Sequence, residues 1–239
     1  ITLGLFNSHM INIEENLVFF FLGSFVLVLA GIVDDFRGIS SNKRFIFQIL
    51  AALIIVKVGG VLLEDLGSLI SVEKLHLDIF SIAFTVFAVV GVINSLNFSD
   101  GIDGMSASLS LVTFISIAFL AYGIKENYAF EFVLLFIVSI TVFLIFNLGL
   151  FVGSSFKIFM GDAGSSYLGF VFGCLLLLTA EAIGIWVWLI ILGLFITDTA
   201  ATLVIRLVAR KNVLDAHQSH IYQQLARHLG SHQRVCGLL

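Results

Sequence analysis

Charged residues are scarce in this chain of 239 residues, since Asp, Glu, Lys and Arg together make up only 12% of it. In a soluble globular domain about a quarter of the residues are charged. Hydrophobic residues make up 59%, and the mean hydropathy is +1.12. The shortage of charge excludes an ordinary soluble domain and indicates a protein of the lipid bilayer.

Cysteine, proline and runs of basic residues are also rare or absent. The two cysteines, Cys174 and Cys236, lack the partner spacing of a zinc site or a disulfide framework, so we interpret both as structural. The net charge of −4 and the absence of a dense basic run exclude a nucleic-acid partner. Proline is absent altogether, which is unusual for membrane-spanning helices, and nothing in the sequence accounts for it.

Long apolar stretches dominate the rest of the chain. A helix needs about 20 apolar residues to cross about 30 Å of hydrocarbon. Open strands would leave backbone groups unpaired in lipid, and the stretches are too long for barrel strands. We therefore predict an all-α fold, a polytopic membrane helical bundle of about seven transmembrane helices over residues 16–33, 45–63, 77–93, 105–122, 129–150, 166–182 and 185–204.

Seven spans would place the polar segments 34–44, 94–104, 151–165 and 205–239 on one side of the membrane. Most of the basic residues lie there: Arg37, Lys43, Arg44, Lys157, Arg206, Arg210, Lys211, Arg227 and Arg234. The positive-inside rule makes this side cytoplasmic. Its acidic residues are all Asp, a short carboxylate that suits metal and phosphate chemistry.

The first polar cluster follows the first predicted span and contains Asp34, Asp35, Arg37 and Gly38. Adjacent carboxylates repel each other, so the pair is stable mainly when a cation is near or when one carboxyl keeps a proton. The pattern fits magnesium binding or general-base chemistry. The alternative is a solvated helix end followed by a turn at Gly38.

The second cluster places four polar side chains at intervals of three residues: Asn94, Asn97, Asp100 and Asp103. The two acids would share a face if the segment turns helically, and the two amides could hydrogen-bond a base or a ribose. The alternative is a turn in which one Asp caps the helix that begins at Met105, but this explains only one of the four.

The third cluster, Gly161, Asp162, Gly164, Ser165 and Ser166, leads directly into an apolar span. A glycine-containing turn at a helix N-terminus offers free N–H groups and the positive end of the helix dipole to a phosphate. Asp162 would then hold the metal ion that bridges the phosphate. The alternative is that Ser165 is an ordinary helix cap.

The fourth cluster contains His217 and His220, which follow several cationic residues. The two imidazoles could bind phosphate, donate a proton or bind a metal. The alternative is an amphipathic cytoplasmic tail with its polar face in water.

Taken in order, these four clusters resemble the motifs of the polyprenyl-phosphate N-acetylhexosamine-1-phosphate transferases, glycosyltransferase family 4. That family includes the bacterial enzymes that begin O-antigen, common-antigen and teichoic-acid synthesis, and phospho-N-acetylmuramoyl-pentapeptide transferase. The resemblance runs over nearly the whole chain. The segment 217–223, His-Gln-Ser-His-Ile-Tyr-Gln, resembles the branch that initiates O-antigen or capsule synthesis, often on deoxy-aminosugars.

The resemblance implies a role for each site residue. Asp34 and Asp35 would serve the lipid phosphate and its deprotonation, and His220 would lie near the diphosphate or sugar, as the catalytic set. Asp162 would be the main ligand of Mg²⁺, or of Mn²⁺ in its place. The substrate-binding set, around the uridine nucleotide, would be Asn94, Asn97, Asp100, Asp103, Asn147 and His217.

The resemblance also implies the reaction and its setting. The expected enzyme transfers N-acetylhexosamine-1-phosphate from a UDP-sugar to undecaprenyl phosphate and releases UMP, either directly or through an aspartyl-phosphate. It would act in the bacterial inner membrane, with its active site in the cytoplasm, as a possible homodimer. Residues 1–239 are expected to be a fragment of a single family-4 domain, without the amino-terminal helices and the carboxy-terminal end.

Two other classes of protein are alternatives. A proton- or ion-coupled transporter would carry acids within its spans and broken helices near mid-membrane, whereas nearly all acids here lie at one interface. Another magnesium-dependent membrane transferase, such as an aromatic prenyltransferase or a CDP-alcohol phosphotransferase, also uses Asp clusters. Neither has the spacing of the Asn-Asp-Gly segment here.

Overall fold

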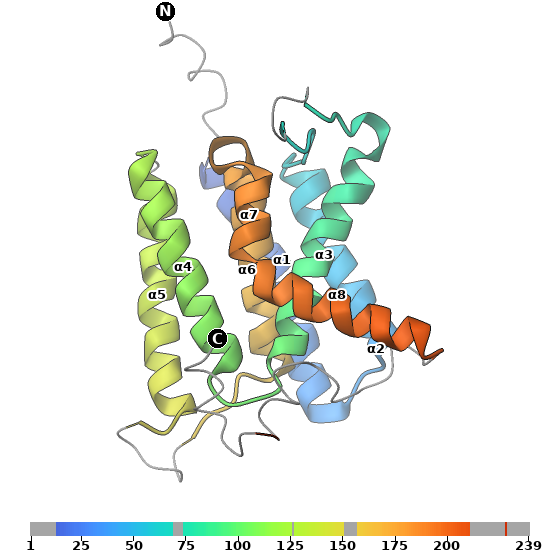
Figure 1. Cartoon of the computed structure of the whole chain (residues 1–239), viewed down its shortest axis with the longest axis vertical. Helices are drawn as coiled ribbons and strands as arrows, with labels where there is room; N and C mark the ends of the chain where they lie inside the picture. Colours follow the sequence, from blue (N-terminus) through green and yellow to red (C-terminus); the bar gives the residue numbers. More distant parts are fainter. Residues whose placement is uncertain (1–12, 69–73, 126, 151–156, 211–227, 229–239) are drawn as a thin grey trace, which may run out of the picture.

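The computed structural model describes residues 13–68, 74–125, 127–150, 157–210 and 228 (Figure 1). The helices, in order, are α1 (Ile13–Arg37), α2 (Ser41–Leu53), the π-helix η1 (Ile54–Val58), the 3₁₀ turn η2 (Asp78–Phe80), α3 (Ser81–Ser99), α4 (Met105–Gly123), α5 (Asn127–Asn147), α6 (Gly161–Ile183), α7 (Ile185–Ile191) and α8 (Gly193–Val208). Within the described part of the chain, β-pairing amounts to one antiparallel bridge between Asp65 and His76. The predicted all-α bundle is confirmed.

Five helices are long and apolar enough to cross a membrane: Val18–Arg37, Asp78–Ser99, Met105–Gly123, Asn127–Asn147 and Gly161–Ile183. The helices α7 and α8 would form a sixth span if they are counted together, although their axes bend by 75° at the break between them. By the length and composition of these helices, the chain is a multi-pass membrane protein.

Two of the seven predicted spans differ from the observed helices. In place of a span over 45–63, α2 continues into η1 and the helix ends at Val58. This helix carries three cations, Lys43, Arg44 and Lys57, and is too polar to be one of the five candidate spans. The predicted span 185–204 is broken near Leu192, so the described residues do not confirm a count of seven.

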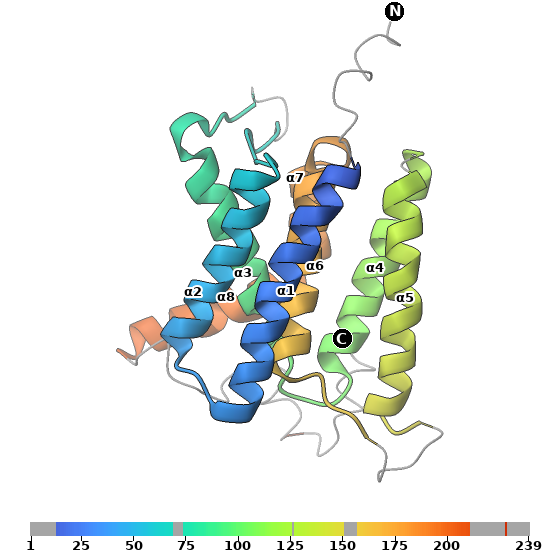
Figure 2. The same cartoon turned by 180° about the vertical axis from the view of Figure 1, so that it is seen from behind.

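The helix α6 lies in the middle of the bundle, between α1 and the α7–α8 pair, with the α4–α5 hairpin on one side (Figures 1 and 2). It contacts α1, α3, α4 and α7. Of its span, 61% is buried inside the protein, against 11% of the α5 span. Aromatic packing joins the hairpin to the centre, because the rings of Phe114 and Phe172 lie 4.5 Å apart.

Glycines let α6 approach its neighbours closely. A Cβ added at Gly31 of α1 would overlap the backbone of Ala163 in α6, and one added at Gly169 would lie 2.5 Å from the Cα of Ile93 in α3. Without a hydrophobic driving force between helices in lipid, small residues provide this close van der Waals packing. The end of α1 therefore lies directly against the start of α6.

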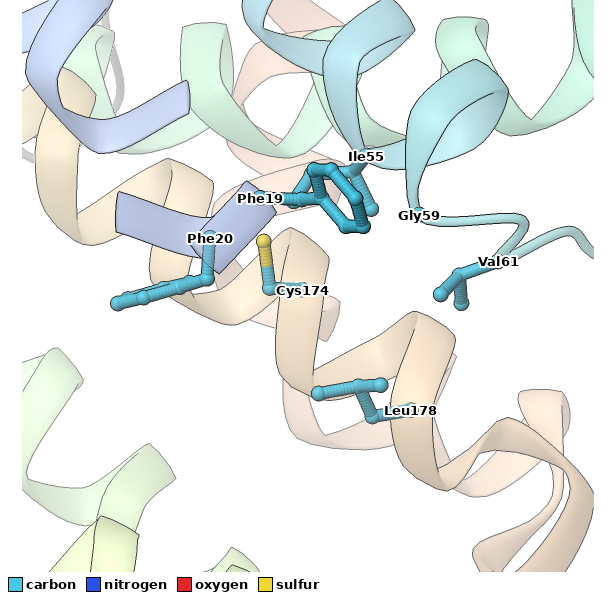
Figure 3. Close-up of a pocket in the computed structure, with 7 residues that line it drawn as sticks. All are labelled: Phe19, Phe20, Ile55, Gly59, Val61, Cys174 and Leu178. Carbon is cyan, nitrogen blue, oxygen red and sulfur yellow. The ribbon is translucent and has the colours of Figure 1, made fainter. Parts of the chain in front are cut away.

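At the other end of α1, a small apolar cavity of about 20 Å³ lies between α1, η1 and α6 (Figure 3). Its wall includes Phe19, Ile55 and Cys174. It has about the volume of one water molecule but offers no group that would hold a polar substrate. The cavity is a packing defect beside the π-helical turn and lies away from the polar clusters.

Gly31→Val is expected to lower the midpoint of thermal unfolding in detergent, because the new side chain must push α1 away from α6. Overpacking of this kind costs about 1–3 kcal/mol. Gly91→Val is the control, since a Cβ at Gly91 meets no atom within 4 Å. Equal midpoints for the two variants would contradict the close contact.

Candidate functional site

Six helix ends meet at one end of the bundle (Figures 1 and 2): the carboxyl ends of α1, α3 and α5 and the amino ends of α2, α4 and α6. The alternating direction of consecutive helices produces this arrangement. It brings together three of the four predicted clusters, those around Asp34, Asp100 and Asp162. The fourth, with His217 and His220, lies outside the described residues.

Arg44, in the first turn of α2, joins carboxylates from two other helices. Its Nη1 donates to Asp162 Oδ2 at 2.6 Å and lies 3.3 Å from Asp34 Oδ2. The side chain of Asp34 is only 8% exposed. Two neighbouring carboxylates that are partly or largely buried are stable together when a positive charge lies close to both, and the guanidinium provides that charge.

The turn between α1 and α2 explains how Arg44 reaches this position. Gly38 has a φ of +63°, which closes the helix with a left-handed residue. The backbone N–H of Ile39 then donates to Asp34 Oδ1 at 2.6 Å. This bond fixes the carboxylate of Asp34 and turns the chain back, so that the first turn of α2 lies beside it.

The carboxylate of Asp35 lies over Gly161, the first residue of α6. A Cβ added at Gly161 would come within 3.2 Å of Asp35 Oδ2, and its φ of +67° already favours glycine. The free N–H groups and the dipole at the start of α6 favour negative charge there. Ser165 is not the cap of this helix, because its Oγ donates back to the carbonyl oxygen of Gly161 at 3.0 Å.

Asn97, near the end of α3, contacts the start of α6 through its amide. Its Nδ2 lies within hydrogen-bond distance of Asp162 Oδ1 at 3.3 Å and of Ser165 Oγ at 3.0 Å. A third acceptor, Ser166 Oγ, is 3.3 Å away. Asn97 therefore orients the carboxylate of Asp162, the predicted metal ligand. The contact of Asn97 with the nucleotide stays a prediction.

Asn94 lies one turn earlier on α3 and faces α2. Its Nδ2 donates to Gln48 Oε1 at 2.6 Å and to the carbonyl oxygen of Val90 at 2.8 Å. Gln48 is buried. Asn94 therefore joins two helices beside the site, and its predicted contact with the nucleotide stays a prediction. Gln48 and Arg44 are the residues of α2 that motif analysis missed, since single polar residues in an amphipathic helix have no distinctive spacing.

Two contacts hold the loop of residues 100–104 against the segment that precedes α6. Lys157 Nζ donates to Asp103 Oδ2 at 2.8 Å. Asn147, which is buried at the end of α5, accepts from the Gly104 N–H at 2.6 Å and donates to the carbonyl oxygen of Ile158 at 2.7 Å. Asn147 thus holds both segments in place from a third helix.

Asp100 lies just beyond the end of α3. Burial, together with the negative charges of Asp162 and Asp103, raises the pKa of Asp100 from 3.8 to about 7. The carboxyl group of Asp100 therefore keeps its proton at pH values at which an ordinary aspartate is ionised. A nearby cation would favour its ionised form.

Comparison with known proteins identifies the family. Residues 17–180 match the family model Glycosyl transferase family 4. The chain belongs to this family. The matched range contains Asp34, Asp35, Asn97, Asp100 and Asp162, so the described site lies within the family domain.

Curated bacterial proteins are similar to this family-4 chain. It is 32% identical over 209 residues to the probable undecaprenyl-phosphate N-acetylglucosaminyl 1-phosphate transferase of Bacillus subtilis, with 85% of this chain and 56% of that protein covered. It is 33% identical over 211 residues to the undecaprenyl-phosphate α-N-acetylglucosaminyl 1-phosphate transferase of Haemophilus influenzae, with 85% and 58% covered. The protein of the same name from Yersinia pestis is 36% identical over 145 residues, with 61% and 40% covered. The chain thus spans about half the length of the curated relatives it matches.

The site of this family-4 chain fits a magnesium ion held by few protein ligands. Among the described residues, no three acidic, His or Cys side chains converge as a metal-binding group. Mg²⁺ usually keeps several waters and binds one or two carboxylates together with substrate phosphates. Asp162 and Asp34 both contact the same guanidinium nitrogen, and the buried Asp34 Oδ2 makes no hydrogen bond within the described part of the chain. Both features suit a cation between the two carboxylates.

Asp100→Asn is expected to raise the midpoint of thermal unfolding at pH 8 in the presence of chelator. The pKa of Asp100 is higher in the folded protein than in an unfolded chain. The free energy of unfolding therefore falls as the pH rises from about 4, where the unfolded chain loses this proton, to about 7, where the folded protein loses it. The variant removes this cost, and its advantage should shrink as the pH is lowered to 5. An advantage of equal size at both pH values would contradict the raised pKa.

Asn147→Ala is expected to lower the unfolding midpoint, because it leaves the Gly104 N–H and the Ile158 carbonyl without their partner. An unpaired buried polar group costs about 1–3 kcal/mol. Asn127→Ala is the control, since Asn127 is exposed at the start of α5. If both variants unfold at the same temperature, Asn147 does not hold the two segments together.

Proposed function

We propose that this chain is the catalytic core of a magnesium-dependent transferase of the bacterial inner membrane. The enzyme moves N-acetylhexosamine-1-phosphate from a UDP-sugar to undecaprenyl phosphate and releases UMP, the first membrane step of a cell-envelope polysaccharide. The observation that carries the proposal is the meeting of Asp34, Asp35 and Asp162 at one end of an apolar helical bundle. The names of the curated relatives give the acceptor lipid and make UDP-N-acetylglucosamine the first donor to test.

The proposed reaction exchanges one phosphoanhydride for another. An oxygen of the lipid phosphate attacks the β-phosphorus of the UDP-sugar, and the bond from that phosphorus to the bridging oxygen breaks as UMP leaves. Such a transfer needs positioning and charge neutralisation more than covalent chemistry from the protein. Mg²⁺, or Mn²⁺, would supply positive charge that offsets the charge of the diphosphate.

The protein's own residues would divide this work. Asp162 would be the main ligand of the metal, with its carboxylate oriented by Asn97, and Oδ2 of Asp34 would share the ion. Asp34 and Asp35 would keep the attacking phosphate unprotonated from the end of α1, beside the start of α6. The loop of Asp100 and Asp103 would bind the uridine part, held in place by Lys157 and Asn147. His220 would complete the catalytic set near the diphosphate or sugar, and His217 would complete the substrate-binding set.

The distribution of charge supports a cytoplasmic site. Among the described residues, the site end carries Arg37, Lys43, Arg44 and Lys157. Three described lysines lie toward the opposite end: Lys57 in η1, Lys74 before α3 and Lys125 between α4 and α5. By the positive-inside rule the site end faces the cytoplasm. A homodimer is also proposed, on the resemblance to the family alone.

The test is transfer of radiolabel from a panel of UDP-N-acetylhexosamines into undecaprenyl phosphate by membranes that contain the full-length protein, with UMP release followed in parallel. We expect magnesium-dependent labelling of the lipid, and a loss of at least a hundredfold in Asp162→Asn. The donor that gives labelling identifies the sugar, and deoxy-aminosugar donors belong in the panel.

Asp78→Asn is the matched control for this assay. Asp78 is exposed at the opposite end of α3, and asparagine tolerates its φ of +43°. This variant should retain wild-type transfer. Absence of transfer from every donor by a folded wild-type protein would overturn the proposed function, and equal activity of Asp162→Asn would overturn the role of Asp162.

A further inference from the structure

Arg44 contacts the carboxylate oxygens that a metal ion at this site would need. We propose that Arg44 is a built-in counter-ion that competes with the divalent cation for Asp34 and Asp162, and so sets the metal affinity of the site. The inference rests on the proposed function, which requires the metal. It assigns Arg44 a role opposite to that of a metal ligand, since its positive charge weakens metal binding.

The competition follows from how the four carboxylate oxygens are used. Asp34 Oδ1 accepts from the Ile39 N–H at 2.6 Å, and Asp162 Oδ1 accepts from Asn97 Nδ2 at 3.3 Å. One oxygen of each carboxylate is thus held by the protein. The other, Oδ2 in both residues, faces Nη1 of Arg44. A cation that binds both carboxylates through these two Oδ2 atoms occupies the position of Nη1, so it and the guanidinium compete for the same oxygens.

The contacts of Arg44 with the two carboxylates differ in length and geometry. Its contact with Asp162 is a short hydrogen bond of 2.6 Å, whereas its contact with Asp34 is 3.3 Å long and lacks hydrogen-bond geometry. A buried carboxylate oxygen without a hydrogen bond is unfavourable. A small cation can approach both oxygens, which the flat guanidinium does not achieve from its position on α2.

The guanidinium can leave without movement of the helices. Gln48, one turn further along α2, is buried and accepts from Asn94 Nδ2 at 2.6 Å, which anchors α2 to α3. The side chain of Arg44 is 34% exposed and has a long flexible stem. The exchange therefore requires only a change in the side-chain rotamer of Arg44.

The test measures metal binding directly, in the absence of substrates. Mn²⁺ binding to the full-length protein in lipid nanodiscs is followed by electron paramagnetic resonance. Arg44→Gln should bind Mn²⁺ about tenfold more tightly than the wild type, within the range of about 5–150-fold that is typical of coupling between two sites. Arg37→Gln is the control, because Arg37 is an exposed cation at the end of α1 and its loss should change the affinity much less.

Stability provides a second readout. Without metal, Arg44→Gln should have a lower unfolding midpoint than the wild type, because two neighbouring carboxylates lose their counter-ion. Added Mn²⁺ should then raise the midpoint more in Arg44→Gln than in the wild type. Arg44→Lys keeps the charge and should stay close to the wild type in both measurements. If Arg44→Gln is unfolded without metal, Mn²⁺ during purification should restore it.

The outcomes separate this inference from the proposed function. If the wild type binds Mn²⁺ and Arg44→Gln binds it with equal or lower affinity, the competition is overturned and the proposed function still stands. An equal gain in affinity in Arg44→Lys, or an unfolded Arg44→Gln that Mn²⁺ does not restore, also overturns it. Absence of Mn²⁺ binding in every variant overturns the metal dependence in the proposed function, and the inference with it.

Discussion

The contact between α1 and α6 at Gly31 and Ala163 is the constraint on which the candidate site depends. It lies about one helical turn before Asp34 and next to Asp162. Because the two backbones touch, carboxylates from segments far apart in the sequence are brought onto the same guanidinium nitrogen of Arg44. A wider separation of the helices would leave each carboxylate alone in a helix end, where water could solvate it.

The close approach of α1 and α6 brings several negative charges together. Asp34, Asp35 and Asp162 meet at the end of the bundle, where the side chain of Asp34 is largely shielded from water, and Asp100 and Asp103 lie in the adjoining loop. Within the described residues Arg44 and Lys157 offset part of this charge. The raised pKa of Asp100 is another response, since a proton replaces the missing cation. The site is thus strongly acidic, and the proposed divalent cation would offset this negative charge.

The helical class and the grouping of three polar clusters could be predicted from the sequence, because apolar length and the alternation of helix direction determine both. The number of spans could not. A hydropathy pattern does not show that the helix containing Lys57 stops at Val58, or that the chain bends by 75° between α7 and α8, where no proline marks the break. Local packing decides both.

The sequence alone determined that the protein lies in a membrane, that its acids gather at helix ends, and that its motifs follow the order found in glycosyl transferase family 4. These properties depend on residue type and spacing. Only the tertiary structure decided which side chains and main-chain groups these polar residues contact. Asn94 pairs with Gln48, Asn147 holds two main-chain segments, and Arg44 contacts two carboxylates. Hydrogen bonds and ion pairs between distant segments depend on helix packing in three dimensions, which residue spacing along the chain does not specify.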